Sequence, residues 1–293
     1  MTHGWASLVT VKSILLLGAI GGAQGEKKVY PVVEGGGKPP WAYLPACVRA
    51  EHRSQQHEDL MVLAPLLCML DGRPGTFVEL GAFTGVNLSN TVMLERCYNW
   101  TGLLIEGSTT NFAQLQQSGR RAKKVHSAVC PGDVDSEVTF AIDGGEVSGE
   151  PATRQKPVGR HATNLVKKLR SSRLETVPCS SLARILDRAG YSEMDILFLD
   201  VEGAEDKVLS SIDPARFSVV VMEAAGYPND GGRLETKLEP LLTRAGFRRE
   251  RSLEERARGA WNPVYVRTNG RMSQRCVACV ESKECRDRYL ASG

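Results

Sequence analysis

The sequence has no large charge excess, no long hydrophobic run and no evident internal repeat. Lysine and arginine total 37 against 34 aspartate and glutamate, so the formal net charge is +3. This near-neutral balance argues against a dedicated nucleic-acid-binding protein, whose surface is strongly basic. The apolar run Ser13–Ala23 has 11 residues, whereas a membrane-spanning helix needs about 20, which excludes a multi-span membrane protein. Apolar residues at 42% and charged residues at 24% exclude a disordered or collagen-like chain.

The first 25 residues have the features of a targeting signal. Lys12 precedes the short apolar run, which ends in the small-residue pattern Ala23-Gln24-Gly25. These features predict a cleavable signal peptide over residues 1–25 and a location in the secretory pathway. A type II membrane anchor and a plastid transit signal are the alternatives. Residues 26–47, rich in Gly and Pro, are expected to form a linker.

All eight cysteines lie beyond this leader, at Cys47, Cys68, Cys97, Cys130, Cys179, Cys276, Cys279 and Cys285. An even number behind a signal peptide favours disulfides, although the sequence does not choose their pairing. Cys276 and Cys279 have the C-x-x-C spacing of a zinc site, but no second such pair follows. We therefore expect a disulfide-bonded tail over residues 271–293.

Short apolar runs alternate with helical patterns over residues 48–270. The strand-like runs are Thr76–Leu80, Gly102–Glu106, Lys124–Val129, Asp195–Asp200, Ser218–Glu223 and Pro263–Arg267. The helical patterns are Val48–Leu70, Asn87–Cys97, Asn111–Ser118, Ser181–Ala189, Ala204–Ser211 and Arg233–Ala245. Uniformly apolar runs such as SVVVME are typical of strands buried on both faces of a parallel sheet. The alternation predicts a doubly wound α/β domain that binds ligands at the carboxyl ends of its strands.

One interval is too long for a single helical crossover. Between Val129 and Asp195 lie 65 residues, with an acidic part around the expected strand SEVTFAID. A basic part follows, with Arg154, Lys156, Arg160, Lys167, Lys168, Arg170 and Arg173. A long insertion in a compact domain is typical of a functional lid or mobile loop; a solvated charged surface is the alternative.

The segment FVELGAFTGVNLSN suggests a cofactor loop after the first strand. Gly81 and Gly85 bracket a tight turn, and Gly81 allows close approach of the backbone to a ligand. Glu106, 25 residues after Gly81, ends the next strand, where an acid can accept hydrogen bonds from ribose hydroxyls. The loop is not G-x-G-x-x-G and begins with Glu79, which suits a cofactor with a cationic tail better than a pyrophosphate. S-adenosylmethionine (SAM) is such a cofactor.

The order FVELGAFTG, LLIEGSTTNFAQL, VHSAV and MDILFLDVEGAEDKVL strongly resembles the FkbM-type SAM-dependent methyltransferases. The resemblance covers residues 76–223. It implies the seven-stranded class I methyltransferase sheet with helices on both faces, here with a long insertion between the third and fourth core strands. It also implies methylation of a hydroxyl oxygen.

By position in the sequence, the resemblance implies that a loop binds the methionine part of the cofactor. Its residues are Glu79, Gly81, Ala82, Phe83 and Gly85.

It assigns the ribose to Glu106 beside Gly107, the adenine edge to Ser127 and Ala128, and a further cofactor contact to Asp200.

The sequence departs from the family pattern at three places. Phe83 stands where Asn is usual, Gly107 where Pro is usual, and Ala183 where an acid is usual. The first departure bears on cofactor affinity and raises the question of activity, whereas the other two are peripheral.

Methyl transfer to an alcohol needs alignment of the acceptor and removal of its proton. Asp200 and Glu202 follow the fourth core strand and Glu223 ends the fifth, so these three acids are the catalytic candidates. No residue is assigned to a metal, although such an acidic cluster can bind magnesium. His161, in the basic stretch, is a weaker candidate, and Glu205 is expected to serve a structural role.

The sequence therefore predicts a SAM-dependent O-methyltransferase of the secretory pathway, acting on a glycan or related small acceptor. The basic stretch suggests an anionic acceptor. A non-catalytic secreted or membrane-tethered binding module that keeps the fold is the first alternative. A dinucleotide-dependent oxidoreductase is the second, disfavoured by the missing third glycine and by Glu79.

Overall fold

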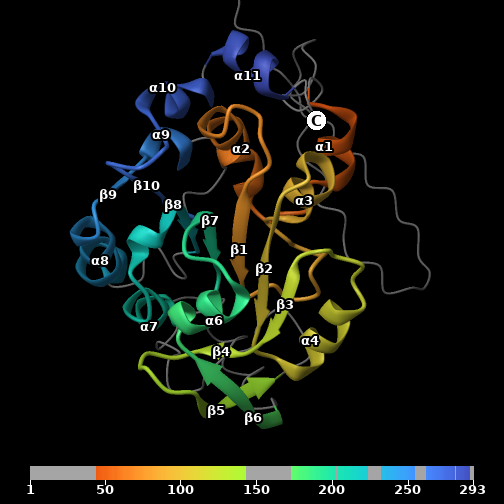
Figure 1. Ribbon diagram of the computed structural model, residues 1–293, viewed down its shortest axis with the longest axis vertical. Coiled ribbons are helices and arrows are strands. Elements are labelled where there is room, and N and C mark those ends of the chain that lie inside the picture. The colour runs from red at the N-terminus through yellow and green to blue at the C-terminus, as the bar shows by residue number, and fades with distance from the viewer. Residues whose placement is uncertain are drawn as a thin grey trace, which may run out of the picture. The chain divides into compact units, whose positions relative to one another are not determined.

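A central sheet of seven strands has the order β3-β2-β1-β7-β8-β10-β9 (Figure 1). The computed structural model describes residues 44–142, 173–201, 203–223, 232–254, 262–280 and 282–290. The strands of this sheet are β1 (Thr76–Leu80), β2 (Thr101–Glu106), β3 (Lys123–His126), β7 (Met194–Leu199), β8 (Phe217–Met222), β9 (Phe247–Arg249) and β10 (Val264–Arg267). The α/β fold expected from the alternating pattern is confirmed.

All neighbouring strands from β3 to β8 run parallel, and β10 is antiparallel to both β8 and β9. The chain moves outward from β1 through β2 to β3, then returns to place β7 on the other side of β1. Leu80, the last residue of β1, is therefore paired with Ile105 of β2 and with Leu199 of β7. The strand order reverses between β1 and β7, which is where open α/β sheets bind ligands.

Helices cover both faces of this sheet. The larger helices are α1 (Ala46–Glu51), α2 (Glu58–Met69), α3 (Val92–Tyr98), α4 (Thr109–Gln116), α6 (Leu182–Ala189), α7 (Glu205–Ser210), α8 (Glu239–Arg244) and α11 (Lys283–Leu290). Shorter helical segments are η1 (Pro214–Arg216), η2 (Leu234–Leu238), α9 (Arg251–Glu254), α10 (Gln274–Val277) and η3 (Ala278–Val280). Among the described residues, none of the helices is long and apolar enough to span a bilayer.

Successive strand residues enter two separate hydrophobic cores, because side chains alternate across a sheet. Phe77, Leu104 and Phe198 face one core, which α2, α3, α10 and α11 close. Val78 and Leu197 face the other, which α6, α7 and α8 close. The strands are thus buried on both sides, which explains why their sequences are apolar without alternation.

The expected insertion contains a second, three-stranded sheet with the order β4-β6-β5 (Figure 1). Its strands are β4 (Ala128–Val129), β5 (Ser136–Ile142) and β6 (Arg173–Ser180), with β5 and β6 antiparallel. Of the basic stretch, only Arg173 belongs to the described residues; the rest, with His161, lies outside them.

All eight cysteines form disulfides: Cys47–Cys97, Cys68–Cys276, Cys130–Cys179 and Cys279–Cys285. The expectation of disulfides is confirmed, and the alternative zinc site at Cys276 and Cys279 is wrong because both sulfurs are bonded. The tail helices α10 and α11 pack into the core beside α2, so residues 43–293 form one compact unit. The predicted signal peptide and nearly all of the linker lie outside the described residues.

Two expected helices differ from the observed ones. The pattern from 48 to 70 divides into α1 and α2, because the chain turns between them and His57 adopts φ +67°. The helix expected from Asn87 begins only at Val92. Residues 89–91 donate hydrogen bonds to the buried Glu79 carboxylate, which holds the preceding segment as a loop.

Two further segments are interrupted. The strand expected over Lys124–Val129 splits at Ser127, where the chain leaves the main sheet and joins the small one. The helix expected over Arg233–Ala245 consists of the π-helical η2 followed by α8. Pro240, in the first turn of α8, has no N–H to continue the regular hydrogen-bond pattern.

Candidate active site

A cavity of about 280 Å³ lies at the carboxyl ends of β1, β2, β7 and β8. Its walls come mainly from the residues that directly follow these strands, including Gly81, Gly107, Asp200 and Glu223. The cavity therefore occupies the position at which the strand order reverses. The sheet topology and the cavity together make this the candidate active site.

Glu79 organises the loop that follows β1. Its side chain is 3% exposed and accepts hydrogen bonds from Ser89 Oγ (2.9 Å), the Asn90 N–H (2.8 Å) and Thr91 Oγ1. Burial raises the pKa of the Glu79 carboxyl, while the positive charge of nearby Arg120 opposes this shift. Glu79 borders the cavity, and its observed contacts fix the loop; its predicted contact with a cofactor stays a prediction.

Gly81 and Gly85 are required by protein packing. A Cβ on Gly81 (φ +85°) would lie 1.9 Å from the Asp200 carbonyl oxygen, and one on Gly85 (φ +77°) would lie 2.4 Å from Leu115 Cδ1. The space expected for a ligand beside Gly81 is thus filled by the end of β7. These two glycines let the loop pack between β7 and α4, and in this way shape the cavity wall.

The Glu106 carboxylate is buried at the end of β2. Its two oxygens accept hydrogen bonds from the backbone N–H groups of Ser108 (2.7 Å) and Phe83 (2.8 Å), with further bonds from the Asn111 side chain and the Gly107 N–H. Burial raises the pKa of Glu106 to about 7, and these hydrogen bonds counteract the shift. An ionised carboxylate has about four acceptor positions, and these donors occupy them, so a ligand hydroxyl would have to replace or share one of the present donors.

Phe83 reaches Glu106 because its backbone is left-handed. Its φ is +50°, which is unfavourable for a bulky side chain and easier for Asn. Asn, which the resemblance to the FkbM family implies at this position, tolerates this backbone better than most residues other than glycine. Ala82 beside it is fully buried and also borders the cavity.

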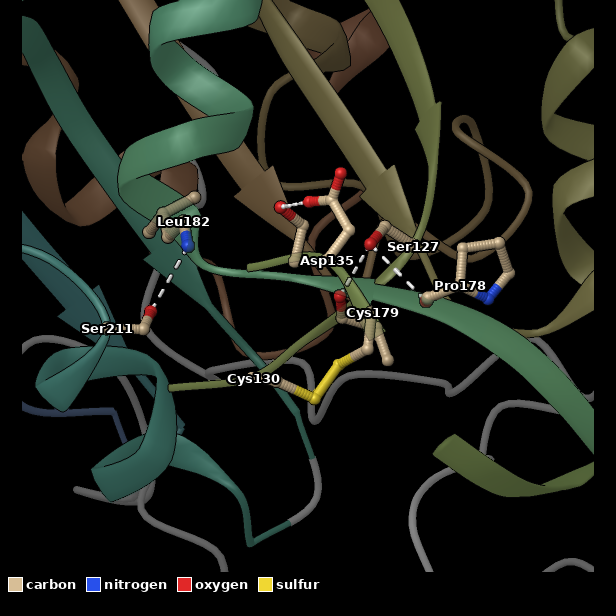
Figure 2. Close-up of a disulfide and its surroundings, with 9 residues drawn as sticks. Ser127, Cys130, Asp135, Pro178, Cys179, Leu182 and Ser211 are labelled. Carbon is tan, nitrogen blue, oxygen red and sulfur yellow. Dashed lines mark hydrogen bonds between the residues drawn. A yellow bond between two sulfur atoms is a disulfide. The ribbon is translucent and has the colours of Figure 1, made fainter. Parts of the chain in front are cut away.

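Ser127 and Ala128 form the far wall of the cavity together with Cys130. Figure 2 shows the Cys130–Cys179 disulfide, which joins the end of this wall to β6. The Ser127 hydroxyl donates to the Ala128 carbonyl at 2.6 Å, so this hydroxyl already has a partner within the wall. The disulfide and this bond fix the predicted adenine edge.

Asp200 and Glu223 are brought together at the ends of β7 and β8. The Asp200 N–H donates to the Leu80 carbonyl at 3.1 Å, and the Glu223 N–H donates to the Leu199 carbonyl at 2.8 Å. Both residues are half-buried and border the cavity. Glu202, the third predicted catalytic acid, lies outside the described residues.

Glu205 has a different role. It is fully buried, accepts from the Gly203 N–H at 2.9 Å and forms an ion pair with Arg233. These contacts hold the turn that leads into α7. In the part of the chain that the structure describes, Cys68, Cys279 and Cys285 form the one group with metal-ligand spacing, and all three are disulfide-bonded.

Several cavity residues were not expected from the sequence, among them the acid Glu58 and the amide Asn262. Glu58 begins α2, and Asn262 lies two residues before β10. A signal existed for Asn262: if the last expected strand is antiparallel, its start lies at the carboxyl edge of the parallel strands. No such signal marked Glu58.

Comparison with known proteins identifies a family. The model of the methyltransferase FkbM domain matches residues 79–249. A search of curated proteins gives no match. Similar solved structures include an FkbM methyltransferase from Methylobacillus flagellatus KT, at 13% identity and a TM-score of 0.40. That match covers 66% of this chain and 43% of the other.

Two other methyltransferase structures are comparably distant. A precorrin-6y C5,15-methyltransferase from Geobacter metallireducens GS-15 has 11% identity and a TM-score of 0.33, with 66% of this chain and 73% of that one covered. The plantazolicin methyltransferase BamL, bound to a triazolic desmethyl analogue and S-adenosylhomocysteine, has 10% identity and a TM-score of 0.36, with 84% and 80% covered. These likenesses are too distant to carry an argument about the site. The family model, in contrast, spans more than half of the sequence, and the chain belongs to the FkbM methyltransferase family.

Proposed function

We propose that this protein is a SAM-dependent O-methyltransferase that acts on a hydroxyl of a sugar, a glycan or a related small acceptor. The observation that carries the proposal is the charge of the cavity wall. Its ionisable residues, among those described, are all acidic: Glu58, Glu79, Glu106, Asp200 and Glu223. SAM carries a sulfonium and an ammonium group, and opposite charges attract strongly where solvent screening is weak.

The residues present fit this cofactor. Glu106 borders the cavity and would accept ribose hydroxyls in exchange for one of its present donors, such as the Gly107 N–H, and Ser127 with Ala128 offers a fixed edge for adenine. The backbone of the loop Gly81–Phe83 lies beside Asp200 at the methionine side. When bound, the cofactor supplies an electrophilic methyl group. The chain's own task is to hold the acceptor in line with that group.

A hydroxyl acceptor must lose its proton during transfer. Asp200 and Glu223 border the cavity at the ends of adjacent strands, so either carboxylate is placed to accept a proton or to orient the hydroxyl. Glu202 is retained as a third candidate from the sequence. No residue of the described part is assigned to a metal.

The four disulfides are consistent with an extracellular or secretory location. Glycans are abundant hydroxyl acceptors there, which supports a sugar as substrate. The suggestion of an anionic acceptor rests on the basic stretch, most of which lies outside the described residues.

Isothermal titration of the oxidised protein with S-adenosylhomocysteine tests this proposal. We expect binding by the wild type, a loss of about tenfold or more in Glu106→Ala and retained binding in Asp200→Ala. Glu51→Ala is the matched control, because this acid, the last residue of α1, pairs with Arg96 of α3 and does not border the cavity. No binding by a folded wild type would contradict the proposal and favour the non-catalytic binding module.

A further inference from the structure

One wall of the cavity is made by two segments outside the family match. The FkbM model covers residues 79–249, whereas Glu58 precedes this range and Asn262 follows it. The two residues are 204 positions apart, yet the Asn262 side-chain amide donates a hydrogen bond to Glu58 Oε1. The N-terminal and C-terminal flanks of the family domain therefore meet at the candidate active site.

The pair is buried and its orientation is defined. Glu58 is 7% exposed and Asn262 is 5% exposed, and both border the cavity. The second carboxylate oxygen of Glu58 accepts the Gln56 N–H at 2.8 Å. Glu58 also forms hydrogen bonds with the Ser54 side chain and with its own backbone N–H, so both of its oxygens have partners that hold the carboxylate in place.

The Asn262 carbonyl oxygen has unused capacity. Because the amide nitrogen faces Glu58, the orientation of this side chain is fixed by its hydrogen bond. The oxygen is buried and accepts no hydrogen bond from the described residues. A buried oxygen without a donor costs free energy, and a ligand donor would remove that cost.

The charged groups of this region are all acceptors, whereas neutral side chains of the wall such as Gln55 and Asn87 can also donate hydrogen bonds. Asp200 and Glu223 add two more carboxylates to the cavity wall, and no Lys, Arg or His of the described chain borders it. A wall of this kind repels an anionic group and favours groups that donate hydrogen bonds, such as hydroxyl and ammonium groups.

The flanks that carry the pair are fastened to the domain. The Cys68–Cys276 disulfide links α2 to α10, and Ser54, just before α2, forms a parallel bridge with Leu88 in the loop after β1. Glu58 is thus held by a disulfide on its helix and a backbone bridge before it, and Asn262 by the pairing with β8 that begins at Pro263 and Val264. Such fixed placement is what a specificity-determining wall requires.

We propose that Glu58 and Asn262 form the acceptor subsite, and that this subsite takes an uncharged or cationic group rich in hydrogen-bond donors rather than an anionic one. The inference rests on the proposed methyltransferase function and narrows its substrate class. An anionic substituent of the acceptor would have to lie outside this subsite. The basic stretch suggests an anionic acceptor, whereas this subsite disfavours an anionic group. Comparing the affinities of anionic and neutral acceptors distinguishes the two.

Burial raises the pKa of Glu58 to about 6, while hydrogen bonds from the backbone lower it. At pH 7.5 the carboxylate is therefore mainly ionised and accepts hydrogen bonds on both oxygens. Below pH 6 it becomes mainly protonated, and its capacity as an acceptor falls.

The test uses the oxidised full chain, saturated with S-adenosylhomocysteine, at pH 7.5. Three probes differ at C6 and in charge: methyl glucoside is neutral, methyl 6-amino-6-deoxyglucoside (the aminoglucoside) is cationic and methyl glucuronide is anionic. Saturation-transfer difference NMR gives their dissociation constants for the wild type, Glu58→Gln, Asn262→Ala and the control Glu51→Gln. Thermal melting and the affinity for S-adenosylhomocysteine show whether each variant is folded.

We expect the glucoside and the aminoglucoside to bind and the glucuronide to bind at least about tenfold more weakly. Glu58→Gln and Asn262→Ala should weaken the first two probes by about tenfold and change the affinity for S-adenosylhomocysteine by less than about twofold. Equal or tighter binding of the glucuronide would overturn the inference. So would unchanged probe affinity in both variants, or no probe binding by the loaded wild type. A wild type that does not bind S-adenosylhomocysteine would instead contradict the proposed function.

Discussion

Glu106 is expected to lose a proton when its proposed ligand binds. Burial raises its pKa to about 7, so the free protein at pH 6 holds this carboxyl mainly protonated. Hydroxyl donors favour the ionised form, and a ribose at this position would lower the pKa and release a proton. We predict that binding of S-adenosylhomocysteine releases close to one proton per molecule at pH 6 and far less at pH 8.

Titration calorimetry in two buffers of different ionisation enthalpy measures this proton count. Glu106→Gln is the control, because an amide does not titrate and its proton count should not respond to pH through this group. The same number of released protons at both pH values in the wild type would show that no hydrogen-bonded ligand group reaches Glu106.

The loop between β1 and α3 has a strained backbone at two residues. Phe83 at φ +50° and Leu88 at φ +60° are non-glycine residues in the left-handed region, which costs free energy. Phe83 is half-buried, so its packing contribution is moderate. We predict that Phe83→Asn is more stable than Phe83→Leu by about 1 kcal/mol, because Asn tolerates this backbone better.

Urea denaturation of both variants measures the difference, and the Leu variant serves as the control for lost aromatic packing. Affinity for S-adenosylhomocysteine should be retained in Phe83→Asn, since the backbone N–H that contacts Glu106 is unchanged. Equal stability of the two variants would mean that the side chain, and not the backbone angle, determines the stability of this loop.

The elements that the sequence predicted well are those determined by local composition. β1 has the expected bounds, Thr76–Leu80, and the apolar runs that became β7 and β8 shifted by one residue, because burial on both faces leaves a continuous apolar signal. The predicted start of α3 was wrong because Ser89, Asn90 and Thr91 donate hydrogen bonds to Glu79, which keeps these residues out of the helix.

The candidate site was likewise predictable only where a residue's position follows from its own strand. Glu106, Asp200 and Glu223 were expected at the cavity because a strand end in a parallel sheet has a known place. Glu58 and Asn262 were not expected, because their contact joins residues 204 positions apart. Pairings of this kind depend on tertiary packing that no short-range pattern contains.

At the scale of the whole molecule, the chain is a family domain whose two flanks are joined to each other. The Cys68–Cys276 disulfide closes a sequence separation of 208 residues and links α2 with the C-terminal helices, whereas Cys279–Cys285 closes a separation of 6. Both flanks pack into the same hydrophobic core on one face of the sheet. The flanks therefore stabilise the fold and also complete one wall of the cavity.

We predict that Cys68→Ser/Cys276→Ser is destabilised far more than Cys279→Ser/Cys285→Ser. Closing the longer loop removes more entropy from the unfolded chain, about 5 against about 2 kcal/mol in the chain-entropy model, with measured values usually smaller. Urea denaturation of the two double variants measures the order. At temperatures where both are folded, the first should also bind methyl glucoside more weakly, because α2 loses its covalent restraint at Cys68 and carries Glu58 in its first turn. Affinity for S-adenosylhomocysteine should be similar in both, since β1, β2 and β7 hold the predicted cofactor residues. Equal stability together with equal glucoside affinity would show that packing alone joins the flanks to the domain.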